Sequence, residues 1–171
     1  MAVYEQRHPL IQHKMGLLRA NSTGTRQCRE LVAEIARLLT YEATRDLPLA
    51  PDVADAWCGE VPVERLAGKK LTVVPILRAG LGMLDGVLDV IPCAKISVIG
   101  MSRDEHSLQP RVYVSKLVPQ IHLRRALLVD PMLATGGSLF AAIDLLKQAG
   151  CQHIRAMVLV ASPDAIARLE Q

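Results

Sequence analysis

The stretch ALLVDPMLATGGS, residues 126–138, decides the fold of this chain. Its first part, 126–130, is an apolar run that ends on an aspartate. The residues that follow include small, hydroxyl-bearing and glycine residues, and they lead directly into a helical pattern at 138–148, which Gly150 ends. An apolar run, a glycine-rich turn and a helical pattern in this order predict one strand and one helix of a parallel sheet.

Further apolar runs at 71–76, 95–100 and 155–161 have the pattern of strands buried on both faces. A helical pattern at 81–90 separates the first two of these runs. Strands and helices that alternate in this way are typical of a doubly wound α/β protein. We therefore predict an α/β fold in which a parallel sheet is flanked by helices, and we expect ligands beyond the carboxyl ends of its strands.

Ahead of the sheet, the sequence predicts an N-terminal helical region and a hairpin arm. Apolar residues repeat at helical spacing over 26–41, and Thr25 is the expected N-cap of that helix. Apolar residues on both sides of Cys58-Gly59-Glu60 predict a short hairpin around Val53–Val63. Such an arm suits an interface, so we expect a homodimer or a higher homo-oligomer.

Length and composition limit the class of protein. The 171 residues fit about one domain, the net charge is only +3, and the 14 arginines are scattered along the chain. A nucleic-acid-binding protein usually has a concentrated basic stripe with stacking aromatics, so we expect no nucleic-acid partner. The sequence has no apolar run of the roughly 18 residues that a membrane helix needs, and its first residues lack the apolar region of a signal peptide. We expect a soluble, cytoplasmic protein without a membrane partner.

The cysteines and histidines do not form a metal-binding pattern. The cysteines Cys28, Cys58, Cys93 and Cys151 stand far apart, which is neither zinc spacing nor the framework of a small disulfide-rich protein. We expect them to be buried free thiols. The histidines show no ligand spacing, so we expect no protein-bound transition metal.

The strand that ends at Asp130 is followed by a candidate anion-binding cradle. Thr135, Gly136, Gly137 and Ser138 stand at the start of the next helix, where backbone N–H groups and the helix dipole favour a phosphate. Asp130 is placed to accept hydrogen bonds from ribose hydroxyls. The alternative is a helix capped by small residues that binds no ligand.

A second strand end carries Arg78, Ala79 and Gly80. Small residues here allow an unusual turn, and Arg78 is placed to neutralise a second phosphate group. The spacing Gly80-x-Gly82-x-x-Asp85 also comes close to a dinucleotide-binding fingerprint, but Asp85 stands where a glycine is needed. A dinucleotide-dependent oxidoreductase therefore stays open as an alternative.

A third candidate segment is the polar stretch Met101–Val118. Long loops without helical or strand periodicity are often functional, so Arg103 is a candidate lid residue over a phosphorylated substrate. The alternative is a two-stranded excursion without chemistry.

Together these segments resemble one family. VDPMLATGGS, residues 129–138, is similar to the phosphoribosyl diphosphate (PRPP) motif of type I phosphoribosyltransferases, in the form found in the uracil phosphoribosyltransferases. Most members of the superfamily carry two adjacent acids here, whereas Pro131 replaces the second acid in the uracil branch. The segments HPLIQHKMGLLR, LLTYEAT, VVPILRAGLGM and KISVIGMSRDE resemble the same branch, in the same order.

The resemblance implies the reaction of uracil with PRPP to give UMP and diphosphate, a step of pyrimidine salvage. It implies that Arg103 and Asp130 are catalytic, and that Mg²⁺ binds through the donor rather than in a cage of protein ligands. It also implies a possible allosteric GTP. The residues that it assigns to the donor are Arg78, Ala79, Gly80, Arg103, Asp130, Pro131, Met132, Leu133, Ala134, Thr135, Gly136, Gly137 and Ser138. The sequence marks no general base.

The resemblance also carries an expectation about the C-terminus. The family continues with a further strand and a glycine-rich loop that reads the uracil edge, whereas this sequence ends at Gln171, in a helix begun by Ser162-Pro163. We therefore expect residues 1–171 to be a single, C-terminally incomplete phosphoribosyltransferase domain. No uracil-binding residue is assigned, because the resemblance places these residues beyond Gln171, and we expect PRPP binding with slow UMP formation. A non-catalytic, nucleotide-sensing regulator of the same fold is the other alternative.

Overall fold

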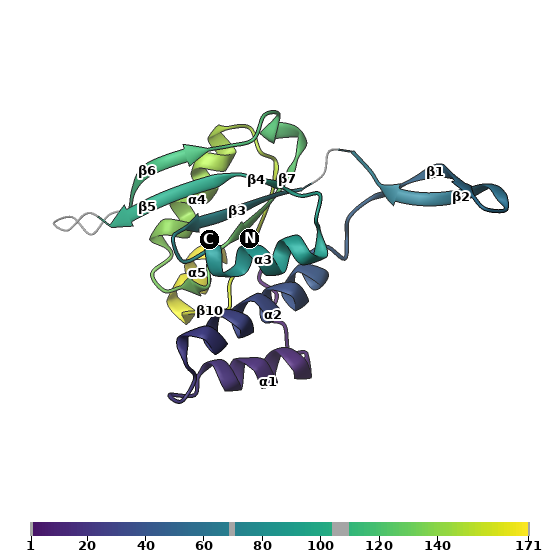
Figure 1. Ribbon diagram of the computed structural model, residues 1–171. Helices are drawn as coiled ribbons and strands as arrows, with labels where there is room; N and C mark the ends of the chain where they lie inside the picture. The colour runs from purple at the N-terminus through teal and green to yellow at the C-terminus, as the bar shows by residue number, and fades with distance from the viewer. Residues whose placement is uncertain (1, 69–70, 104–109, 171) are drawn as a thin grey trace.

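The structure is a computed structural model that describes residues 2–68, 71–103 and 110–170. Its main sheet has the strand order β6-β5-β3-β7-β9, with the short β4 beside β3. Neighbouring strands run parallel except β6, which is antiparallel to β5 (Figure 1). The strands are β3 (Thr72–Leu77), β4 (Lys95–Ile96), β5 (Val98–Arg103), β6 (Pro110–Lys116), β7 (Arg125–Val129) and β9 (His153–Met157). The predicted α/β fold with a mostly parallel sheet flanked by helices is confirmed.

Helices cover both faces of this sheet, which explains the uninterrupted apolar runs. In β7, Ala126 and Leu128 pack in one core cluster with α4 (Gly137–Gln148). Leu127 and Val129 point to the other face, in a cluster with α2 (Thr25–Ala43) and α3 (Leu81–Val90). These side chains of β7 are at most 2% exposed.

The run 155–161 was expected to be one strand buried on both faces, and this prediction is wrong. The edge strand β9 ends at Met157, and His153 and Arg155 on it are exposed. The chain then forms β10 (Val160–Ala161), which pairs in parallel with β8 (Met132–Leu133) outside the main sheet. The break places the segment after β9 against the loop that follows β7.

The N-terminal helices pack below the sheet in Figure 1. They are α1 (Pro9–Leu18) and α2, whose buried side chains include Leu31 and Ile35. The N-cap of α2 is Gly24, in an extended conformation, and Thr25 is the first helical residue, so the predicted cap is one residue off. A glycine reaches the cap conformation without a side-chain hydrogen bond, and local propensity alone did not distinguish the two positions.

The predicted hairpin is confirmed and is longer than expected. It consists of β1 (Leu49–Ala56) and β2 (Gly59–Leu66), and it projects away from the body of the molecule (Figure 1). Its turn holds Trp57, which is 99% exposed, and Cys58, which is also exposed. All four cysteines are free, but only Cys151 is buried: Cys28 is half-buried, and Cys58 and Cys93 are exposed, so the expectation of buried thiols is wrong for these two.

The polar stretch expected at 101–118 is mainly the end of β5 and the antiparallel strand β6. It is thus a two-stranded excursion of the sheet. The predicted lid loop falls largely on residues 104–109, which lie outside the described residues. A short 3-10 helix, η1 (Ile121–Leu123), connects β6 with β7. No helix in the described part of the chain has the length and hydropathy of a membrane span.

The last element of the structure is α5 (Pro163–Glu170), which follows β10 as Ser162-Pro163 predicted. The expected uracil-binding segment would follow Gln171, and Gln171 itself lies outside the described residues. The structure therefore leaves the expectation of uracil-binding residues beyond Gln171 as a prediction.

Candidate active site

The carboxyl ends of two neighbouring strands hold most of the predicted site. Strands β3 and β7 are parallel neighbours, with Pro75 opposite Val129. Arg78 follows the end of β3 and Asp130 follows the end of β7. The sheet therefore brings to one edge two loops that are about fifty positions apart in the sequence.

The loop after β7 forms the predicted anion cradle. Gly136 is the N-cap of α4, with φ +84° and ψ −10°, and no side chain among the described residues caps this helix. The first N–H groups of α4 therefore have no partner within the helix, as at every helix start, and they are available to an anion. A Cβ atom on Gly136 would lie 2.4 Å from Cε2 of Phe140, so both backbone angle and space favour glycine here.

Asp130 lies beside the cradle and is half-buried. Its backbone N–H donates to the carbonyl of Met157 at 3.2 Å, which holds the loop against the end of β9. Its carboxylate Oδ1 accepts a long 3.4 Å hydrogen bond from the N–H of Met132. Burial raises the pKa of the Asp130 carboxyl, and the bond from Met132 opposes that change. A carboxylate has about four acceptor sites, so Asp130 retains acceptors for ribose hydroxyls or for water bound to Mg²⁺.

The turn after β3 exposes Arg78 and Ala79 and buries Gly80. The peptide bond between Leu77 and Arg78 is cis, and the N–H of Gly80 donates to the carbonyl of Ile76 at 2.9 Å. A Cβ atom on Gly80 would lie 2.4 Å from the carbonyl oxygen of Val129 in β7. The absence of a side chain at Gly80 thus lets this turn pack directly on the neighbouring strand, at the base of the cradle loop.

The third predicted segment also returns to this region. The backbone of Arg103 pairs with Pro110, the first residue of β6. A Cβ atom on Gly137 would lie 3.7 Å from Cδ of Pro110, which places this end of the β5–β6 ribbon beside the first turn of α4. The side chain of Arg103 lies outside what the structure describes.

Sequence analysis missed the residues behind the cradle. Ser162, between β10 and α5, donates from Oγ to the carbonyl of Ala134 at 2.5 Å and from its N–H to the carbonyl of Leu133 at 2.9 Å. Arg168 in α5 donates from Nη1 to the carbonyl of Thr135 at 2.7 Å. Ser162 was recognised only as a helix cap, a role that it also has, since Oγ accepts from the N–H of Ala165 at 3.2 Å. Nothing local to Arg168 in the sequence signals its contact with a loop thirty-three positions away.

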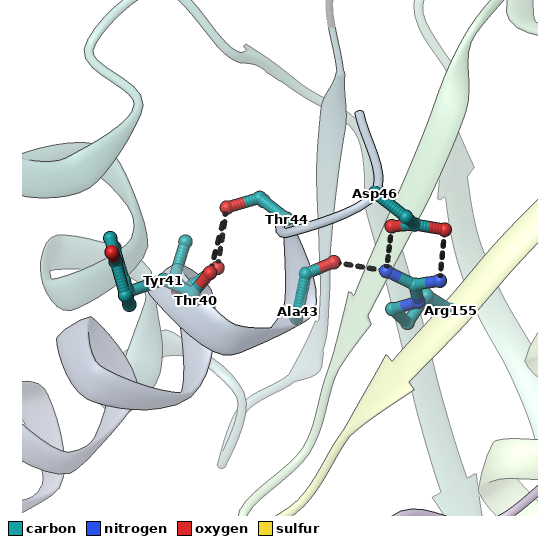
Figure 2. A network of polar contacts seen from close by, with 6 residues as sticks. All are labelled: Thr40, Tyr41, Ala43, Thr44, Asp46 and Arg155. Carbon is teal, nitrogen blue, oxygen red and sulfur yellow. Dashed lines mark hydrogen bonds and ion pairs between the residues drawn. The ribbon is translucent and has the colours of Figure 1, made fainter. Parts of the chain in front are cut away.

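A pocket of about 190 Å³ lies at the other end of the strands from the cradle, beside the amino ends of β3, β7 and β9. Arg155 binds Asp46 there with two hydrogen bonds, at 2.7 and 2.9 Å, and also donates to the carbonyl of Ala43 at the end of α2 (Figure 2). The hydrogen bond from Arg155 lowers the pKa of Asp46 to about 2. Since this carboxyl has its lower pKa in the folded state, the ion pair stabilises the fold above about pH 4, and the effect is lost as the pH falls through about 2. The pair is exposed, so this contribution is small, and the network anchors α2 to β9 far from the cradle.

Comparison with known proteins identifies the fold family. Residues 5–171 match the family model described as uracil phosphoribosyltransferase. The chain belongs to the uracil phosphoribosyltransferase family. It is similar to the solved structure of the AQ2163 protein from Aquifex aeolicus, with a TM-score of 0.89 and 35% identity, over 98% of this chain and 80% of that one.

More distant solved structures share the fold alone. A hypoxanthine phosphoribosyltransferase of Staphylococcus aureus gives a TM-score of 0.58 at 18% identity, over 80% of this chain and 66% of that one. A hypoxanthine-guanine phosphoribosyltransferase of Bacillus anthracis gives 0.58 at 15% identity, over 80% of this chain and 70% of that one.

Gly80, the first glycine of the spacing that raised the dinucleotide alternative, has a packing explanation, since its turn packs on β7 as described above. Nearby in the sequence, a Cβ atom on Gly86 would lie 2.2 Å from the carbonyl oxygen of Ala33, so Gly86 lets α3 approach α2 closely. With the family established, this spacing needs no dinucleotide to account for it.

Proposed function

We propose that this protein transfers the phosphoribosyl group of PRPP to uracil, giving UMP and diphosphate. The observation that carries the proposal is the uncapped start of α4 behind Gly136, with Asp130 at its side and the Arg78 turn at the same sheet edge. Family membership supports the substrate class. PRPP carries a 5′-phosphate, a ribose and a diphosphate in this order. These groups match the anion cradle, the Asp130 carboxylate and the cationic Arg78 turn.

Each group of the donor has a proposed partner. The loop from Pro131 to Ser138 binds the 5′-phosphate, through backbone N–H groups of residues after the proline and through the hydroxyls of Thr135 and Ser138. Asp130 accepts hydrogen bonds from the ribose hydroxyls. Arg78, with Ala79 and Gly80, and Arg103 hold the diphosphate.

In the proposed reaction, the bond between the anomeric carbon and the diphosphate oxygen breaks, and its electron pair leaves with the diphosphate. N1 of uracil forms the new bond to that carbon, and its proton passes to solvent water, since no residue is assigned as a general base. The sugar becomes cation-like, so the nearby Asp130 carboxylate stabilises it, while Arg78 and Arg103 stabilise the departing anion. Mg²⁺ held by the donor's own oxygens would add Lewis-acid stabilisation of the diphosphate, and the Asp130 carboxylate has the oxygen chemistry that this ion prefers.

Selectivity for uracil is proposed from the family, with the base-reading segment expected beyond Gln171. The prediction is that residues 1–171 bind PRPP but form UMP more slowly than a version extended with the family's C-terminal segment. The physical reason is that holding the base at attack distance supplies roughly 7–11 kcal/mol in well-oriented reactions. Equal rates for both versions, at equal folded concentration, would place the uracil pocket within residues 1–171. A cytoplasmic location and allosteric GTP likewise stay predictions.

The donor site is tested by thermal shift and by UMP formation. PRPP with Mg²⁺ is expected to raise the Tm of the wild type in a concentration-dependent way, whereas NAD or NADP should not. In the Gly136→Val variant, the Cβ atom would clash with the Phe140 ring and the left-handed backbone would be strained, which distorts the cradle, so its Tm should not respond to PRPP. An equal response of wild type and variant would contradict the assignment of this loop.

The same experiment separates the second candidate, a regulator that senses nucleotides without catalysis. A regulator would respond to PRPP in the thermal shift but would form no UMP even in the extended version. UMP formation that depends on PRPP, uracil and Gly136 would exclude it.

A further inference from the structure

We propose that Arg168 is a positioning residue for the donor site: it holds the cradle from behind and so aims the N–H of Gly136 at the 5′-phosphate. The inference rests on the proposed function, because it concerns the same phosphate site. It assigns a task to α5, which contributes no residue to the donor set predicted from the sequence.

The segment after β9 donates hydrogen bonds to several carbonyl groups of the cradle loop. The carbonyl of Pro131 accepts from the N–H groups of Leu159 and Val160 at 3.1 and 3.2 Å. The carbonyls of Leu133 and Ala134 both accept from Ser162, and the carbonyl of Thr135 accepts from Arg168. Residues 159–168 therefore hold the back of the loop.

Peptide geometry turns these contacts into an orientation of the N–H groups. In a trans peptide the C=O of one residue and the N–H of the next lie in one plane and point in opposite directions. The bond from Arg168 to the carbonyl of Thr135 thus directs the N–H of Gly136 away from α5. The bond from Ser162 to the carbonyl of Ala134 directs the N–H of Thr135 the same way. Both N–H groups belong to the proposed phosphate cradle.

Arg168 is fixed by a second contact. Its guanidinium carbon lies 4.8 Å from the centre of the Phe140 ring, in a cation–π arrangement. That ring fills the space that a Cβ on Gly136 would need. The arginine therefore bridges α5 to the first turn of α4 and to the loop, and it constrains the residue with the left-handed backbone from two sides.

Because Arg168 is exposed, its loss should cost little stability, and the effect should appear in donor binding. The matched control is Arg155, which also donates to a backbone carbonyl at the end of a helix, but at the opposite edge of the sheet. The probe is PRPP with Mg²⁺, with binding measured by calorimetry on the full chain. Arg168→Ala should raise the Kd about fivefold to tenfold, and Arg155→Ala should stay within about twofold of the wild type. Arg168→Lys should recover part of the affinity, because its ammonium can donate to the same carbonyl.

The outcomes separate the possible explanations. A wild type that does not bind PRPP overturns the proposed function and this inference with it. A wild type that binds, with an unchanged Kd for Arg168→Ala, overturns the inference only. The ratio of the variant's Kd to the wild type's should be the same at about 50 and 500 mM salt, because Arg168 acts through a carbonyl. A ratio that falls with salt would mean that the guanidinium contacts the donor directly, and would also overturn the positioning role.

Discussion

At the scale of single residues, the negative charge of Asp130 does not stabilise the protein in the absence of ligand. Burial raises the pKa of Asp130, so the folded protein binds a proton at this group more tightly than the unfolded chain does. Stability from this group is present below the ordinary pKa of 3.8 and is lost as the pH rises through the higher folded value. At neutral pH the ionised Asp130 therefore destabilises the fold, a cost that is consistent with the proposed donor-binding role.

This predicts opposite effects of Asp130→Asn on stability and on function. The variant should melt about 1–3 °C above the wild type at pH 7, because an uncharged group replaces a half-buried charge. The difference in Tm should shrink as the pH falls through the raised folded pKa of the wild-type carboxyl, where that carboxyl becomes protonated. The kcat/KM for PRPP should fall about 10–100-fold, since a charged acceptor is lost. A Tm below that of the wild type at pH 7 would show that hydrogen bonds of the carboxylate outweigh its burial.

At the scale of elements, glycines with the same chain neighbourhood have different tasks. A Cβ atom on Gly80 would meet backbone atoms of β3 and β7, and these cannot move aside. Gly82, two positions later in α3, would place a Cβ 3.5 Å from a methyl group of Val32, which is ordinary contact. By their spacing in the sequence, both glycines belong to one motif. Only their packing in the structure distinguishes the glycine that is required from the one that is not.

The matched pair Gly80→Ala and Gly82→Ala tests this difference. Gly80→Ala should lower the free energy of unfolding by about 1–3 kcal/mol, because its Cβ overpacks against main-chain atoms. Gly82→Ala should be neutral or stabilise by up to about 1 kcal/mol, because alanine is the better helix residue. Denaturant unfolding of both variants gives the comparison. A tolerated Gly80→Ala would mean that the turn after β3 can move away from β7.

At the scale of the whole molecule, the hairpin arm lies outside the single body formed by the sheet and its helices (Figure 1). The arm exposes apolar side chains that the body does not cover, among them Leu49 at 52%, Val53 at 55% and Trp57 at 99%. An isolated two-stranded hairpin is marginally stable in water, so contact with a second copy would stabilise it. We propose a homodimer whose interface includes this arm.

The Trp57→Ser variant is predicted to weaken the dimer at least about tenfold, since a buried tryptophan is a frequent hot spot of interfaces. Light scattering after size exclusion at micromolar concentrations measures the change in mass. Tyr41→Ser removes another exposed aromatic side chain, 69% exposed on α2, and is the control that should leave the mass unchanged. A wild-type chain that is monomeric at these concentrations would contradict the proposed interface.

The sequence by itself determined most of the helices and strands and the family. The buried strands β3 and β7 follow from short uninterrupted apolar runs, because helices cover both faces of the sheet. The helices α2, α3 and α4 follow from apolar residues that repeat every three or four positions, and the hairpin follows from apolar residues on both sides of a glycine turn. The candidate cradle followed from the residue types around Gly136, because a left-handed N-cap and a close anion both favour glycine. The edge strand β9 was one exception, since an edge position exposes alternate residues that the apolar pattern does not indicate. The run 95–100 was another, because it divides into β4 and β5 and exposes Lys95 and Ile96.

Only the tertiary structure decided which loops meet. Strand order brings the Arg78 turn next to Asp130, and the short pairing of β8 with β10 brings α5 behind the cradle. The contact of Arg168 with the carbonyl of Thr135 joins residues far apart in the sequence. A backbone carbonyl has no side-chain identity, so no residue pattern marks it as a partner. Such contacts depend on the position of whole elements, and the packing of the two core clusters on either face of the sheet fixes that position.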